Sequence, residues 1–121
     1  IGDDAFNGAL FDSLKLPENL IHIGKSAFRG TNLKEIVIPN AVEDIGIWAF
    51  MDCESLKNIT IKNANTNINW PAITGRKDKK PIIISAPKKS KANKYCAEHG
   101  ERYNLIFEPF ATGFIKNIFK R

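Results

Sequence analysis

The chain has few of the residues that disulfide scaffolds, metal sites and membrane spans require. Its 121 residues include two cysteines and two histidines, without metal-ligand spacing. No apolar run approaches the roughly 18 residues that a membrane-spanning helix needs. The eight glycines do not recur every third residue, which excludes collagen. We therefore expect no metal, no cofactor and no transmembrane segment.

What the sequence does contain is a repeat. The motif IGxxAF begins at Ile1, Ile23 and Ile45, a step of 22 residues each time. Between the copies lie short runs in which apolar and other residues alternate, namely LKLP, IVIP and ITIK. Alternation with period two indicates a half-buried strand. The spacing therefore predicts a solenoid of short parallel strands stacked every 22–23 residues, with a turn-rich convex side.

The repeat register predicts which side chains point inward. Each unit, here called a rung, contributes an apolar pair to the interior, and the register gives about five rungs over residues 1–107. The pairs are Leu14/Leu16, Ile36/Ile38, Ile59/Ile61, Ile82/Ile84 and Leu105/Phe107. A second interior column starts at Phe6, Phe28 and Phe50 and continues as Ile73 and Cys96. We expect Gly24 and Gly46 to occupy turn positions with positive φ.

The segment IGKSAFRGTNLKEIVIPNAVEDIGIWAFMDCESLKNITI, from Ile23 to Ile61, resembles the BspA-type leucine-rich repeat family. The resemblance implies a leucine-rich repeat solenoid that is non-catalytic and recognises or adheres to other proteins, such as host or matrix proteins. It also implies a cell-surface or secreted location, although no signal peptide is visible in this chain. Because the chain begins inside a rung, we expect it to be the C-terminal part of a longer protein.

The last rung and the residues after it differ from the others. Residues 85–107 form a degenerate closing rung, with a short helix expected near 90–99, capped by Ser90 and ended by Gly100. Residues 108–121 form an amphipathic basic tail. The tail could cap the last rung, lie on a membrane surface or dock on a partner chain.

The concave strand face is the predicted site for a protein partner. Its central column is Lys15, Val37, Thr60, Ile83 and Ile106, flanked by Glu35 and Asn58. Apolar residues dominate the C-terminal part of this column, which indicates either a contact surface or a surface covered by the tail. The two interpretations stay open at this point.

A basic C-terminal half suggests an alternative, the binding of an anionic polymer. Residues 1–75 carry six Lys/Arg and nine Asp/Glu, whereas residues 76–121 carry twelve and four, which together give the net +5. The predicted anion patch comprises Arg76, Lys77, Lys79, Lys80, Lys88, Lys89, Lys91 and Lys94. Its ligand would be a glycosaminoglycan, an acidic lipid or nucleic acid without sequence specificity, since no nucleic-acid-binding motif occurs. The same charges would also be explained, without any ligand, by a solvated surface at the end of the solenoid.

One pair of residues could suggest catalysis. Cys96 and His99 are three residues apart on the expected helix, and a Cys–His pair is the minimum for a thiolate nucleophile. Cys96 also falls on the interior column, where a free Cys packs as a small apolar residue. No orienting group or oxyanion donor accompanies the pair. We therefore expect no enzyme activity, and no Cys53–Cys96 disulfide across two rungs.

Overall fold

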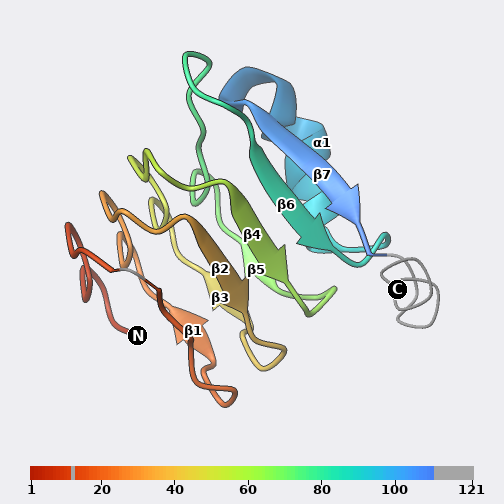
Figure 1. Ribbon diagram of the computed structural model, residues 1–121. Coiled ribbons are helices and arrows are strands. Elements are labelled where there is room, and N and C mark those ends of the chain that lie inside the picture. Colours follow the sequence, from red (N-terminus) through yellow and green to blue (C-terminus); the bar gives the residue numbers. More distant parts are fainter. Residues whose placement is uncertain (12, 111–121) are drawn as a thin grey trace, which may run out of the picture.

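The chain winds into stacked rungs that form two parallel sheets (Figure 1). The computed structural model describes residues 1–11 and 13–110. The larger sheet has the order β2-β4-β6-β7, with bounds Glu35–Ile38, Asn58–Ile61, Ile82–Ala86 and Leu105–Pro109. The smaller sheet has the order β1-β3-β5, with bounds His22–Ile23, Asp44–Ile45 and Asn67–Ile68. This arrangement confirms the predicted solenoid of stacked parallel strands.

Alternation along each strand of the larger sheet places apolar side chains in the interior. In β2 and β4 the isoleucines are buried while the residues between them are exposed or half-buried. β6 buries Ile82 and Ile84 in the same way, as predicted. Because every rung has an apolar face, burial requires a neighbouring rung, and the core is one continuous cluster.

The phenylalanine column forms the second part of the core. The ring of Phe28 stacks between those of Phe6 and Phe50, with centroid separations of 5.5 and 5.4 Å. Ile73 continues the column through a parallel bridge to Phe50, as the repeat predicts. Cys96 is also buried, although it lies on a helix and not on a turn.

Backbone hydrogen bonds join the turns of neighbouring rungs as well as the strands. The Phe28 N–H donates to Ala49 O at 2.9 Å, and the Phe50 N–H donates to Ala72 O at the same distance. This ladder requires the turns to lie close together. A Cβ added to Gly46 would lie 2.7 Å from the Lys25 nitrogen, which explains the glycine.

The predicted positive φ at Gly24 and Gly46 is therefore wrong. The left-handed positions in these turns are Ser26 and Trp48, with φ of 56° and 61°. The glycines serve the close approach of one rung to the next, because a side chain there would collide with backbone.

The predicted register between β4 and β6 is also wrong, by two residues. Ile59 pairs with Ile84 and Thr60 with Ser85, whereas the sequence spacing had aligned Ile61 with Ile84. Phe50 still bridges Ile73, so the two extra residues lie in the basic loop between Ile73 and β6. Because side chains alternate with period two, an even shift leaves the same residues facing inward. The next step, from β6 to β7, keeps the predicted register.

The first predicted strand does not form. Leu16 is buried, as expected, but the described residues around it pair with no strand. Before this segment, the Phe11 N–H donates to the Asn32 side chain at 2.5 Å. The larger sheet starts at β2.

The C-terminal helix α1 spans Lys91–Tyr103, four residues beyond the predicted end. Ser90 caps its start as predicted, accepting a hydrogen bond from the Asn93 N–H at 3.1 Å. The predicted end at Gly100 is wrong, because the left-handed cap is Asn104. Gly100 lies inside the helix, where a Cβ would come within 2.9 Å of Leu105 O. β7 then runs through Pro109, two residues past the predicted end of the solenoid.

Tyr95 of α1 satisfies the backbone of the last convex turn. Its hydroxyl accepts from the Ile73 N–H at 3.0 Å and donates to Ile73 O at 2.6 Å. Burial raises the pKa of Tyr95 to about 12, so the hydroxyl keeps its proton at neutral pH. One side chain thus replaces both hydrogen bonds that a further rung would have made.

We predict that Tyr95→Phe destabilises the fold by about 1–3 kcal/mol, because it leaves two buried backbone groups unsatisfied. Tyr103→Phe is the matched control, since the Tyr103 hydroxyl has no hydrogen-bond partner among the described residues. Urea denaturation of both variants measures the free energy of unfolding. Equal stability of the two variants would contradict a closing role for Tyr95.

Candidate recognition surface

The exposed face of the larger sheet brings the predicted partner-binding residues together, but in two columns. One column comprises Glu35, Asn58, Ile83 and Ile106, because β4 pairs with β6 in the shifted register. The other column begins with Val37 and Thr60 and continues through Ser85 and Glu108. The predicted single column from Lys15 to Ile106 is therefore corrected.

Ser85 and Glu108 lie on this side of the sheet and were missed by the sequence register, but Ser85 is buried, with 8% of its surface exposed. Ser85 sits beside Asn58, with 3.5 Å between the Ser85 Oγ and the Asn58 Oδ1. The sequence signal for this placement was Ser85 itself, the only polar residue in the run PIIISA, because a serine is expected on the less apolar side of a strand.

A groove of about 570 Å³ lies on this face at its N-terminal end. Val37 lines it and is 46% exposed. Lys15, Glu35, Asn58 and Thr60 also line the groove, so five of the seven predicted residues meet there. The charged residues in its lining are Lys15, Glu18, Lys34, Glu35 and Lys62. The lining therefore combines apolar, amide, hydroxyl and charged side chains.

Ile83 and Ile106 lie outside this groove, on β6 and β7. Ile106 is 51% exposed, while Ile83 is half-buried. The interpretation that the tail covers them concerns mainly residues 111–121, which lie outside the described residues. It stays a prediction.

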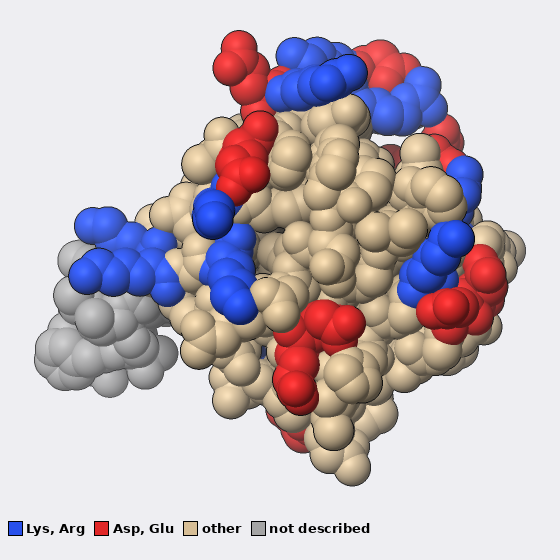
Figure 2. Space-filling view, turned by 180° about the vertical axis from the view of Figure 1, so that it is seen from behind, with Lys and Arg blue, Asp and Glu red and all other residues tan. Residues whose placement is uncertain are grey.

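The predicted anion patch is divided into two groups. Arg76 to Lys80 precede β6, whereas Lys88 and Lys89 follow it, and Lys91 and Lys94 belong to the first turns of α1. A five-residue strand of about 16 Å separates the ends. Figure 2 shows Lys and Arg as separate groups, several beside Asp or Glu, on the face that it presents.

Two members of the predicted patch have partners within the fold. Arg76 contacts Glu54 and Asp78, each at 2.6 Å, and its hydrogen bond lowers the pKa of the Asp78 carboxyl. Lys91 donates to the Asn67 side chain at 2.7 Å. The Arg76 charge is thus paired with carboxylates, whereas a hydrogen bond to a neutral amide leaves the charge of Lys91 unpaired.

The Cys96–His99 pair lacks the features of a nucleophile. Burial raises the pKa of the Cys96 thiol to about 11, which opposes the thiolate. The His99 ring stacks on Trp70, with 4.0 Å between centroids. Burial likewise raises the pKa of Cys53, and both cysteines are free.

Sequence spacing did not reveal the aromatic cluster around His99. Trp70 from the β5–β6 loop contacts His99, Tyr95 and Tyr103, all on one side of α1. The helical spacing of the last three was visible, but the position of Trp70 opposite them depends on the fold. The cluster attaches α1 to the convex side.

Over residues 1–11 and 13–110, no group of three or more His, Cys, Asp or Glu side chains could hold a metal ion. No helix in the same part of the chain is long and apolar enough to cross a membrane.

Comparison with known proteins identifies the family. The family model described as "BspA type Leucine rich repeat region" matches residues 1–100, in six copies. The chain therefore belongs to the BspA-type leucine-rich repeat family, in agreement with its parallel stacked strands. A search of curated proteins and a search of solved structures each found no match. Members of this family are generally non-catalytic recognition modules.

We predict that Cys96 in the folded protein reacts with a disulfide reagent at pH 8 roughly a hundredfold more slowly than an exposed thiol, because little thiolate forms. The rate should rise to that of a free thiol in denaturant. Mass spectrometry of the labelled peptides follows the reaction and separates Cys96 from Cys53, which is also a free thiol. Fast labelling of Cys96 without denaturant would revive the thiol-nucleophile hypothesis.

Proposed function

We propose that the chain is a protein-recognition or adhesion module that binds a partner through the exposed face of β2, β4 and β6. We further propose, from its family, that it acts at the cell surface or after secretion, with host or matrix proteins as partners. The observation that carries the proposal is the groove around Val37.

The composition of the groove fits a protein partner. The exposed Val37 has the amide Asn58 and the hydroxyl Thr60 on the neighbouring strand, and charged residues line the same groove. Protein interfaces likewise combine apolar contacts with polar and charged ones. The parallel strands hold these side chains at fixed spacing, which reduces the entropic cost of binding.

A second candidate function is the binding of an anionic polymer. It is favoured by the members of the predicted patch that form no ion pair within residues 1–11 and 13–110, namely Lys77, Lys79, Lys80, Lys88, Lys89, Lys91 and Lys94. The division of the basic residues by β6 weakens it, because a polymer would have to reach both ends of the strand. Binding should then fall steeply with salt.

We predict that Val37→Asp reduces binding to the strongest ligand in a panel of purified extracellular-matrix proteins by tenfold or more, about 1.4 kcal/mol. An unpaired carboxylate at the centre of an interface costs desolvation energy. Surface plasmon resonance measures the dissociation constant.

Ile21→Asp is the matched control, because Ile21 is also 46% exposed but does not line the groove. It should leave binding within about twofold, which corresponds to a few tenths of a kcal/mol. Equal losses in both variants, or none in Val37→Asp, would argue against recognition through this face.

A further inference from the structure

Two lysines stand side by side at the start of neighbouring strands. Lys34 directly precedes β2 and Lys57 directly precedes β4. The Lys57 N–H donates to Lys34 O at 2.7 Å, so the two residues are adjacent in the stack. Both side chains are exposed. Neighbouring strands are about 4.8 Å apart, so their like charges repel.

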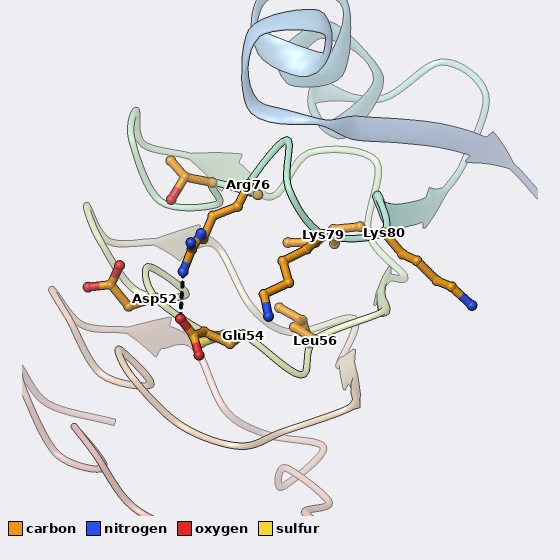
Figure 3. Close-up of a pocket in the computed structure, with 10 residues that line it drawn as sticks. Asp52, Glu54, Leu56, Arg76, Lys79 and Lys80 are labelled. Carbon is orange, nitrogen blue, oxygen red and sulfur yellow. Dashed lines mark hydrogen bonds and ion pairs between the residues drawn. The ribbon is translucent and has the colours of Figure 1, made fainter.

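Lys79 and Lys80 lie in the loop before β6, with Pro81 between Lys80 and the strand, and the register places Ile82 rather than a lysine beside Lys57. Both line a small cavity of about 40 Å³ together with Leu56, the residue before Lys57. Figure 3 shows Lys79 extending toward Leu56 and Glu54, and Lys80 extending away from the cavity. We call Lys34, Lys57, Lys79 and Lys80 the lysine rim.

The acidic side chains near the lysine rim are already paired. Arg76 contacts Glu54 and Asp78, as described, and the Glu54 contact is drawn in Figure 3. Asp52 lies 3.5 Å from Arg29. None of the four rim lysines forms an ion pair with any other described residue. The four lysines are therefore free of ion pairs, although Arg76 balances the charge of only one of the carboxylates Glu54 and Asp78.

The fold holds the basic loop in place. The Asn104 side chain donates to Arg76 O at 2.8 Å and to Lys79 O at 2.9 Å. Asn104 is itself fixed as the left-handed cap of α1. The backbone that carries Lys79 and Lys80 is thus anchored to the helix, which favours a preorganised surface.

We propose that the lysine rim binds an acidic, extended segment of the protein partner, which lies across the strands along the strand-start edge of the groove. The proposal rests on the proposed function and adds the chemistry of the partner. Carboxylates of the segment would relieve the repulsion between the lysines, while an apolar side chain contacts Val37. Glu35, the residue after Lys34, lies on the exposed face. Its carboxylate would repel the carboxylates of the partner segment and so favour their position at the lysine rim.

A sulfated polymer fits the same charges less well. Such a polymer has no apolar side chain for Val37, and the groove that borders the rim contains Glu18 and Glu35. These two carboxylates would repel a chain that carries negative charge on all sides. A peptide can place its carboxylates on one side only, because side chains of an extended strand alternate.

The test uses a fluorescein-labelled peptide that alternates Glu with Val, and a counterpart with Gln in place of Glu. Fluorescence anisotropy should detect binding of the Glu peptide and little binding of the Gln peptide. The double variant Lys34→Glu/Lys57→Glu should bind the Glu peptide at least about tenfold more weakly. The control Lys88→Glu/Lys89→Glu has the same net charge and should stay within about twofold.

Equal losses in the two double variants would overturn the proposal, because net charge alone would then explain binding. Rim-dependent binding of a heparin oligosaccharide without binding of the Glu peptide would also overturn it, in favour of the polymer. If Val37→Asp abolishes binding of the matrix protein while the rim variant binds the Glu peptide normally, the proposed function stands and this inference fails.

Folding of the rim variants is checked separately. Lys34→Glu alone places opposite charges side by side, so its thermal midpoint should equal or exceed that of the parent. Lys34→Gln/Lys57→Gln removes the charges without adding new ones and should also weaken the Glu peptide. Loss of binding in a variant with an unchanged midpoint supports the rim, and retained binding in the Gln variant overturns it.

Discussion

The close approach of one rung's backbone to the next is the constraint on which this structure depends. Hydrogen bonds join neighbouring rungs at the strands and again at the turns, as between Phe28 and Ala49. Such bonds require small residues at the positions where one turn approaches the next, which explains Gly46 and the buried Ala49. The stacked phenylalanine rings occupy the same interior position in successive rungs.

A stack of this kind needs an end that satisfies its last backbone groups. On the convex side α1 takes this role, with the Tyr95 hydroxyl bonded to both groups of Ile73. On the concave side β7 continues the sheet in register with β6. The same helix, through Asn104, fixes the loop that carries Lys79. Closure of the stack and organisation of the basic loop therefore share one element.

Much of the fold could be predicted from the sequence, because a repeat constrains many residues at once. The three copies of IGxxAF specify the strands, the phenylalanine column and its continuation at Ile73. The two-residue shift before β6 could not be predicted, since an even insertion preserves the alternation on which the prediction depends. The role of Gly100 also escaped prediction, because it depends on the path of β7 across the helix.

The candidate site was predicted less completely than the fold, for a related reason. Register along one strand identified Val37, Asn58 and Thr60, which do line one groove. The pairing of Arg76 with Glu54 and the adjacency of Lys34 and Lys57 depend on contacts between rungs. The anion patch was predicted from the positions of basic residues along the sequence, without these contacts between rungs. It therefore grouped lysines that β6 separates in the structure.

The most direct test of the central claim, that the rungs form one cooperative stack closed by α1, is native-state hydrogen exchange of the turn amides. The account predicts that the amides of Phe28, Phe50 and Ile73 exchange with one common free energy, equal to that of global unfolding. Fast exchange at Ile73, with Phe28 and Phe50 still protected, would contradict closure of the stack by Tyr95.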